Sequence, residues 1–318
     1  MALRNFAISI SVFNIVGYFF LGFEQPWLWP FIALATAYTT EILLEVIGAR
    51  AQGRAPRFLG NGFRGLVEFL YPAHITGLAL NMLTYVNDRV GVMIFGVVLA
   101  IGAKWVLQAP VKGRMRHYMN PSNLGIAVIL LLFPWASIAP PYHFTEHISG
   151  PLDWLLPAVI ILGGTMINGK LTGRMWLIAG WLSTFALQAV VRGVVLDTSI
   201  PGALAMMTGV AFVLFTNYMI TDPGTTPSHP GAQFAFGAGV AVVYALLTGA
   251  GIAYGIFFAT AIVCLIRGGF LWSLYLADKA RAGREAAAAA APAPATPAAP
   301  APSVNGSTPH PEKEVVPA

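Results

Sequence analysis

Residues 90–107 read VGVMIFGVVLAIGAKWVL, an apolar run that contains a single charge, Lys104. A helix needs about 20 apolar residues to cross the hydrocarbon core of a bilayer, so this run predicts a membrane span. Similar runs fill most of the chain, because 57% of the 318 residues are hydrophobic and 10% are charged. Soluble domains carry about 25% charged residues. The composition therefore excludes a water-soluble enzyme and indicates a polytopic membrane protein.

Ten apolar segments are predicted to span the membrane, which makes the fold class an all-α integral membrane protein. The segments are 6–23, 27–47, 66–85, 90–107, 124–138, 154–167, 175–191, 200–220, 234–247 and 251–266. The segments 124–138, 154–167 and 234–247 are short for a straight crossing. Either these three helices extend into their polar borders, or they are half-helices that meet within the membrane.

The positive charges predict which segments face the cytoplasm. With the N-terminus inside, 15 of the 18 lysines and arginines fall in inner segments, Arg89 and Arg192 fall outside, and Lys104 lies within a span. The positive-inside rule requires such a bias. We therefore expect a multi-pass protein of the cell's inner (plasma) membrane with both termini in the cytoplasm. The net charge of +5 suits loops that face anionic lipid, so the lipid bilayer is the expected partner and nucleic acid is not.

A change of composition predicts where the membrane domain ends. Residues 1–280 form the polytopic domain, with halves of about 1–138 and 154–270. Residues 281–318 are rich in alanine and proline, and Ala286–Ala291 can prolong the last helix. The tail has too few large apolar residues to offset the loss of chain entropy on folding. It is therefore expected to be disordered in the cytoplasm.

Ionisable side chains inside the spans are the first candidates for function, because burying them in a membrane is costly. Glu41 and His74 lie deep in the second and third spans, and for them a functional and a structural role are equally open. Glu45, Glu68 and Lys104 lie near the ends of their spans. We expect the side chains of these three to extend to the interface.

Two polar junctions on the inner side are the second group of candidates. Asn120-Pro121-Ser122-Asn123 precedes the fifth span, and Thr221-Asp222-Pro223-Gly224-Thr225-Thr226 closes the eighth. Free N–H groups at a helix end, together with side-chain hydroxyls, suit the polar edge of a ligand. The expected ligand-binding residues bordering a shared cavity are Asn120, Ser122, Asn123, Thr221, Asp222, Thr225 and Thr226. The alternatives are that Asn120 and Ser122 only cap the helix and that Asp222 only caps its turn through an Asx bond.

A metal site is not expected. His143, Glu146 and His147 spell H-x-x-E-H, the inverted order of a zinc-peptidase motif. Zinc chemistry would need these residues on a regular helix with a distant third ligand, whereas here they follow Pro140-Pro141 in a short loop. The single cysteine, Cys264, excludes a disulfide framework and a cysteine-ligated cluster.

Both junctions are similar to motifs of a known family. Asn120-Pro-Ser-Asn-Leu-Gly, continuing to Phe133-Pro134, resembles an N-P-x-x-x-G…F-P segment, and Tyr218-Met-Ile-Thr-Asp-Pro223 resembles an F-M-A-T-D-P signature. These motifs belong to a family of membrane subunits (NqrB/RnfD-like) that the sodium-pumping NADH:quinone oxidoreductase and the Rnf complex share. The resemblance covers roughly residues 60–270. It is closest to the small stand-alone members associated with enediyne antibiotic biosynthesis (UnbU type), through Tyr71–Gly77 and Pro140–Glu146 as well.

The resemblance implies two five-helix halves arranged as inverted repeats with broken helices, a role in electron transfer, and other membrane or redox subunits as partners. In the large complexes FMN is attached to the threonine of an S-G-A-T motif in the outer loop after the F-P helix. Here residues 139–153 form that loop, which reads Ser149-Gly150-Pro151 and holds only Thr145. We therefore expect a non-covalent flavin (FMN or riboflavin) or a quinone, and not covalent FMN.

Two functions are thus open. The first is an electron-transfer or redox-coupled membrane component, not necessarily with catalysis of its own. The second is a transporter or self-resistance component for a hydrophobic product or an ion, which inverted halves and the intramembrane residues Glu41, His74 and Asp222 also suit.

Overall fold

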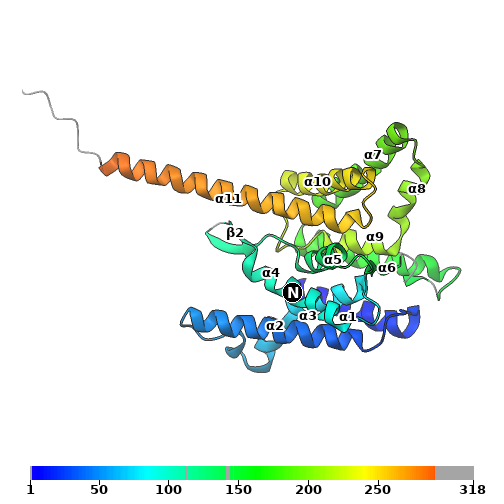
Figure 1. Cartoon of the computed structure of the whole chain (residues 1–318), viewed down its shortest axis with the longest axis horizontal. Helices are drawn as coiled ribbons and strands as arrows, with labels where there is room; N and C mark the ends of the chain where they lie inside the picture. The colour runs from blue at the N-terminus through cyan, green and yellow to red at the C-terminus, as the bar shows by residue number, and fades with distance from the viewer. Residues whose placement is uncertain (1, 112, 141–143, 146, 291–318) are drawn as a thin grey trace, which may run out of the picture. The chain divides into compact units, whose positions relative to one another are not determined.

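The computed structural model describes residues 2–111, 113–140, 144–145 and 147–290, and helices dominate this part of the chain (Figure 1). Described residues up to Tyr275 form one compact unit, and a second unit begins at Leu276, within the last helix. In chain order the helical elements are α1 (Ala2–Val16), η1 (Gly17–Leu21), α2 (Trp29–Ala51), η2 (Arg57–Leu59), α3 (Gly62–Leu83), α4 (Val90–Val106), α5 (Pro121–Leu132), α6 (Leu152–Met166), η4 (Ile167–Thr172), α7 (Met175–Leu196), α8 (Ile200–Ala205), η5 (Met206–Thr208), α9 (Val210–Leu214), η6 (Phe215–Met219), α10 (Pro230–Gly249) and α11 (Gly255–Ala290).

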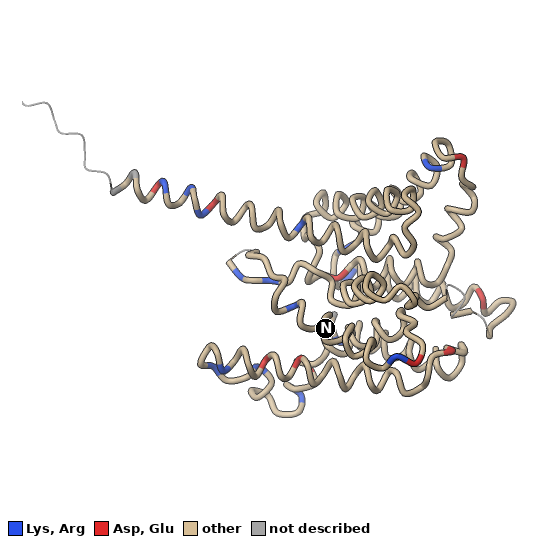
Figure 2. Tube along the Cα trace, viewed as in Figure 1, with Lys and Arg blue, Asp and Glu red and all other residues tan. Residues whose placement is uncertain are grey.

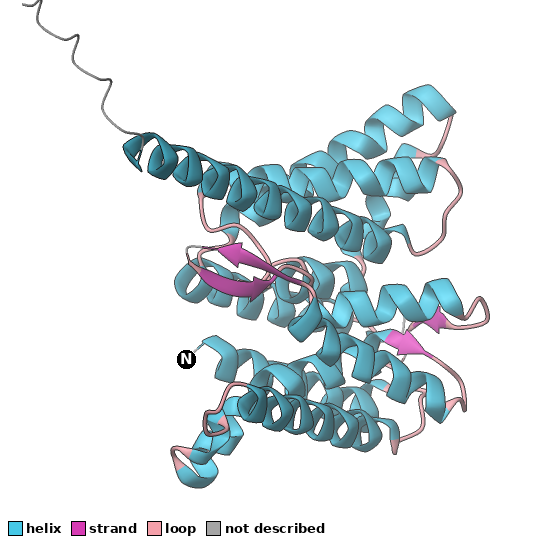
Figure 3. Cartoon of the chain, turned by 60° about the vertical axis from the view of Figure 1, so that its left-hand side comes forward, coloured by secondary structure: helices cyan, strands magenta, loops and turns pink. Residues whose placement is uncertain are grey.

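Two short strand pairs join these helices (Figure 3). The strands β2 (Gln108–Val111) and β3 (Arg114–His117) form an antiparallel pair between α4 and α5, with Gln108 opposite His117. The strands β1 (Thr84–Tyr85) and β4 (Ser137–Ile138) pair the end of α3 with the segment that follows α5. The strands therefore only connect helices, and the membrane-crossing elements are all helical.

The chain is a multi-pass membrane protein by helix length and apolar composition. Among the described residues, seven helices are long and apolar enough to cross a bilayer, and a bent pair makes an eighth if it counts as one span. Large apolar side chains point outward from these helices; Trp154, for example, is 81% exposed. Figure 2 shows long stretches of the trace without charge. An apolar outer surface of this kind is suited to contact with lipid.

The ten predicted spans correspond one for one to helical segments, but not all have the expected form. The helix of the sixth span extends through Asn168-Gly169 to Thr172, and that of the ninth begins at Pro230, so both are full-length. In contrast, α4 has 17 residues and α5 only 12. At 1.5 Å per residue α5 is roughly 18 Å long, well short of a bilayer core of about 30 Å. Ten crossings therefore stay a prediction.

The eighth segment, predicted as a span over 200–220, consists of two helical pieces. Its helix breaks at Gly209, where the extended backbone separates Ile200–Thr208 from Val210–Met219 by an angle of 63°. The second piece continues into the π-helical turn η6. The apolar run over 200–220 is thus one segment made of two helices, and the bend lies at Gly209.

One packing arrangement occurs twice. The first helix of each predicted half ends in a π-helical turn, η1 or η4, and each turn is closed by a glycine with positive φ, Gly22 at 75° and Gly173 at 64°. Such φ values favour glycine because it has no Cβ. The second and fourth helices of each half, α2 with α4 and α7 with α10, also pack together.

Buried asparagines join the first and third helices in both halves. In the first half, Asn81 Nδ2 donates to Asn14 Oδ1 at 3.1 Å. In the second, Asn168 Nδ2 donates to the main-chain oxygen of Asn217 at 2.7 Å. A fully buried threonine, Thr84 or Thr221, follows the third helix in each case. Polar side chains between membrane helices must find such partners, so these links orient the first and third helices.

Candidate functional site

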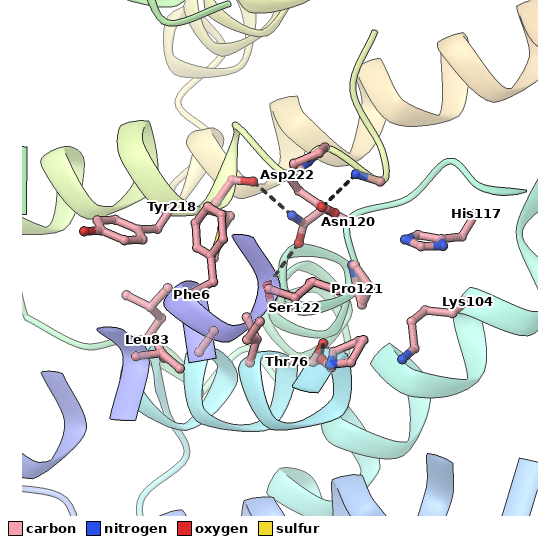
Figure 4. A pocket seen from close by; sticks show the side chains of 18 of the residues that line it. Phe6, Thr76, Leu83, Lys104, His117, Asn120, Pro121, Ser122, Tyr218 and Asp222 are labelled. Carbon is pink, nitrogen blue, oxygen red and sulfur yellow. Dashed lines mark hydrogen bonds between the residues drawn. The ribbon is translucent and has the colours of Figure 1, made fainter. Parts of the chain in front are cut away.

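A cavity of about 470 Å³ lies among α1, α3, α4, β3, the start of α5 and the end of η6. Its walls are mostly apolar, from Phe6 and Ile10 of α1 to Met82 and Leu83 of α3. The polar or partly polar lining side chains are Thr76, Lys104, Arg116, His117, Asn120, Ser122, Tyr218 and Asp222. Figure 4 shows Phe6, Leu83 and Tyr218 toward one end of the cavity, and Lys104 and His117 toward the other. A pocket of this size with apolar walls and a few polar groups is typical of a small-molecule site.

The first junction is positioned by the N-cap of α5. Asn120 Oδ1 accepts hydrogen bonds from the main-chain N–H of Asn123 and from Ser122 Oγ, both at 3.0 Å. Its Nδ2 donates to the main-chain oxygen of Met219, also at 3.0 Å. Asn120 therefore caps α5, as one alternative had it, and in addition connects the two junctions (Figure 4).

The second junction is a turn organised by Asp222. Its Oδ1 accepts from the main-chain N–H of Gly224 at 3.0 Å, and its Oδ2 accepts from Thr225 Oγ1 at 3.1 Å. The Asx turn of the structural alternative is thus present, and Asp222 nevertheless lines the cavity. Thr226 Oγ1 donates to the main-chain oxygen of Asp222 at 2.6 Å.

Only part of the predicted ligand-binding set lines the cavity. Asn120, Ser122 and Asp222 do, whereas the hydroxyls of Thr225 and Thr226 serve the turn. Asn123 Nδ2 instead donates to the main-chain oxygen of Phe257 at 2.9 Å, and the fully buried Thr221 donates to that of Asn217 at 2.8 Å. Asn123 thereby attaches the first junction to α11, whereas Thr221 bonds to the helical turn that precedes it.

Lys104 and Glu41 form an ion pair at the polar end of the cavity. Lys104 Nζ lies 2.6 Å from Glu41 Oε2, and the two side chains are 10% and 8% exposed. The expectation that Lys104 extends to the interface is therefore wrong, because a buried carboxylate on a neighbouring helix neutralises it. Lys104 lines the cavity, and Glu41 lies behind it as its ion-pair partner.

The expectation that Glu45 extends to the interface is also wrong. Its side chain is fully buried and is paired with Arg54 and with Arg57, whose main-chain N–H also donates to it at 2.8 Å. It is a structural anchor for the segment between α2 and α3. Glu68 is half exposed and pairs with Arg64 at 2.9 Å, as a residue near the interface can.

His74 lies outside the cavity lining. Its Nε2 is 2.7 Å from Ser11 Oγ and its Nδ1 is 2.6 Å from Tyr38 Oη, so the imidazole bridges α1, α2 and α3. Ser11 Oγ also donates to the main-chain oxygen of Ala7 at 2.8 Å. A single neutral tautomer of the imidazole can therefore make both hydrogen bonds. In this structure His74 links three helices.

His117 and Arg116 are cavity residues that sequence reasoning missed. Both lie on β3, and the pairing of β3 with β2 brings them to the polar end. Burial lowers the pKa of His117, while the nearby Asp222 acts in the opposite direction. A sequence signal was hardly available, since RMRH beside a membrane span looks like an ordinary basic loop.

The H-x-x-E-H motif cannot be assembled as a site from this structure. His143 and Glu146 lie outside the described residues, and the ring of His147 lies against Gly22. Elsewhere in the described part of the chain, no group of three histidine, cysteine, aspartate or glutamate side chains is placed to hold a metal ion.

No protein-family model matches the chain, and no curated protein matches it. The assignment of a function therefore depends on the cavity and on the residues around it.

Proposed function

We propose that this chain is an electron-transfer or redox-coupled membrane component that holds a non-covalent flavin or quinone in the cavity. The observation that carries the proposal is the convergence of both polar junctions on one mostly apolar cavity. The NqrB/RnfD-like resemblance, and the implied association with enediyne biosynthesis, add the redox role. Other redox or membrane subunits would then supply and remove the electrons.

The lining suits a planar ring with polar edges. Apolar walls from α1 and α3 would contact its faces, while Lys104 and His117 offer hydrogen-bonding groups at one end and Ser122 offers one between the two ends. A bound flavin or quinone would supply reversible electron transfer, and the protein would bind, orient and shield it. Covalent FMN is not part of the proposal, because the loop 139–153 lacks the attachment motif.

We also propose ten crossings built as two inverted five-helix repeats, with both termini in the cytoplasm. The paired π-helical turns and the two asparagine links support the repeat, since each recurs at corresponding helices of the two halves. An odd number of crossings per half inverts the second half relative to the first. The cavity would then open toward the cytoplasmic side, where both junctions are predicted.

Purification tests the proposal directly. The full chain in detergent should show a flavin absorption spectrum, or should release a quinone on extraction with organic solvent. Ala79→Leu, which adds side-chain volume to the lining, should lower the amount of bound ligand. Ala35→Leu makes the same change at an exposed position of α2 and should not. A preparation with neither flavin nor quinone would contradict the proposal.

The second candidate is a transporter or self-resistance component for a hydrophobic product or an ion. The observation that favours it is the buried Glu41–Lys104 pair at the cavity wall, because intramembrane charges mark transport pathways in many carriers. A carrier would show substrate flux in vesicles without a stoichiometric redox ligand. The same purification therefore separates the two functions.

A further inference from the structure

Three arginines lie on segments that line the cavity or contact its neighbours. Arg116 on β3 lines the cavity and is exposed, Arg174 reaches the main-chain oxygen of the cavity residue Pro223, and Arg267 precedes Gly268, which lies against Tyr118. Within the described part of the chain, none of them has a carboxylate at ion-pair distance. In contrast, Arg54 and Arg57 form ion pairs with Glu45, and Arg64 forms one with Glu68. Positive charge that lies beside a cavity and has no carboxylate partner favours the binding of an anionic group.

Arg174 is the most buried of the three. It precedes α7 and is 8% exposed. One terminal nitrogen donates a long hydrogen bond of 3.4 Å to the main-chain oxygen of Pro223, and Nε has no partner in the described structure. A guanidinium has five N–H donors, and buried donors are expensive to leave unpaired. The side chain is therefore short of acceptors where it reaches the Asp222–Gly224 turn, which lines the cavity.

Arg267 is placed by the packing of α11 on the β2–β3 pair. Trp272 Nε1 donates to the main-chain oxygen of Gln108 at 2.9 Å. Gly268 lies so close to the ring of Tyr118 that an added Cβ would be 2.5 Å from Cδ2. Arg267 thus sits beside the segment from β3 to Asn120, within electrostatic range of Arg174. Arg116, on β3, lines the cavity itself.

Neighbouring charges leave an excess of positive charge. Lys104 and Glu41 neutralise each other. Asp222 is the opposing charge, and both of its carboxylate oxygens accept hydrogen bonds within its own turn. The 22-residue helix α7 begins directly after Arg174, so its N-terminal dipole end adds to the attraction for an anion.

We infer that Arg174, Arg267 and Arg116 form a binding site for a phosphate group beside the polar end of the cavity. This inference rests on the proposed function in one respect, namely that the phosphate belongs to the ligand whose ring fills the cavity. The flavin would then be FMN, held by its phosphate without a covalent bond. Free inorganic phosphate presents the same chemistry and is the other source to test.

The first experiment compares FMN with riboflavin, which differ by the phosphate. Each is titrated into the purified full-length protein, with quenching of flavin fluorescence as the readout. FMN should bind at least about tenfold more tightly, because charge-assisted hydrogen bonds to phosphate are strong. Arg174→Gln and Arg267→Gln should reduce FMN affinity to that of riboflavin and leave riboflavin affinity unchanged. Arg192→Gln, at the other end of α7, is the matched control and should change neither.

The second experiment uses inorganic phosphate alone. Phosphate should raise the melting temperature of the wild type above the value in chloride of equal ionic strength, and Arg174→Gln should abolish the difference. Arg174→Lys, which retains the charge, should restore part of it and shows that the site is folded.

The outcomes separate the two ideas. Equal binding of FMN and riboflavin would overturn the phosphate site and leave the proposed function standing. Stabilisation by phosphate without binding of either flavin would support the site and contradict a flavin ligand. The absence of both effects would overturn the phosphate site, while a quinone found on extraction would still support the proposed function.

Discussion

The side-chain amide of Asn120 donates a hydrogen bond of 3.0 Å to the main-chain oxygen of Met219, a residue 99 positions later in the chain. The same side chain caps α5 through its oxygen. A single residue therefore starts one cavity-lining helix and attaches it to the end of another. The two junctions that border the cavity are positioned relative to each other by this contact.

Variants of Asn120 should separate its two roles. Asn120→Ser retains an N-cap oxygen but cannot reach Met219, so it should lower the free energy of unfolding by about 1 kcal/mol. Asn120→Ala loses both roles and should lower it by about 2 kcal/mol. Unfolding in mixed micelles measures both values. Ser199→Ala, which removes the N-cap of α8, should cost only a capping interaction, and an Asn120→Ser variant as stable as the wild type would contradict the linking role.

The Lys104–Glu41 pair should behave non-additively. Removing one partner leaves a buried charge unpaired, so Lys104→Met or Glu41→Leu should each cost about 3–5 kcal/mol in the free energy of unfolding. The double variant Lys104→Met/Glu41→Leu should regain most of that loss, because no buried charge remains. The exposed pair Arg64–Glu68 is the control, and its disruption should have no measurable effect. Additive losses at Lys104 and Glu41 would show that the charges do not depend on each other.

Asp222 can be tested with a substitution that retains shape and removes charge. Asp222→Asn can still accept from Gly224 and can pair with the Thr225 hydroxyl, so the variant should fold and insert normally. Asp222→Ala loses both hydrogen bonds and should be less stable by about 1–3 kcal/mol. If Asp222 contributes its charge to the site, Asp222→Asn alters ligand affinity. If Asp222→Asn binds the ligand with unchanged affinity and Asp222→Ala misfolds, Asp222 acts only as the cap of its turn.

His117 should make stability depend on pH in a defined direction. Burial lowers its pKa below the ordinary value of 6.5, with Asp222 and Glu41 raising it and Lys104 and Arg116 lowering it further. As the pH falls through 6.5, His117 takes up a proton in the unfolded chain before it does so in the folded protein. The free energy of unfolding therefore decreases as the pH falls through this range. This loss should be smaller in His117→Gln when melting temperatures are compared between about pH 7.5 and about pH 5.5.

The matched control for that experiment is His229→Gln, at the exposed start of α10. It should retain the pH dependence of the wild type. If His117→Gln loses as much stability on acidification as the wild type does, another group is responsible.

Reporter fusions should establish the topology. Fusions at Gly113 and after residue 280 should report a cytoplasmic location, and fusions at Asp88 and near residue 146 an outside one, as the bias of positive charge predicts. The pair at Asp88 and Gly113 tests whether α4 crosses. The pair at Gly113 and residue 146 tests the 12-residue α5. Reporters on the same side within either pair would remove that crossing.

Local sequence accounts for much of the helical architecture. Apolar runs identify each helical segment, Asn120-Pro121 predicts the start of α5, and the prolines after Asp222 predict where the eighth segment stops. These features depend on neighbouring residues in the chain, namely on side-chain hydropathy, on the N-cap oxygen and on the missing N–H of proline. Residues of both junctions line one cavity, which local sequence signals identified as two separate polar segments.

Tertiary structure alone decided how the polar groups are satisfied. Asn168 can lie inside the lengthened helix of the sixth span because its side-chain amide donates a hydrogen bond to the main-chain oxygen of Asn217, 49 residues away. Lys104 can be buried because Glu41, 63 residues before it, neutralises the charge. His117 joins the cavity through strand pairing. In a membrane the cost of each polar group depends on a partner brought by another helix, and a partner that is distant in the chain leaves no local pattern in the sequence.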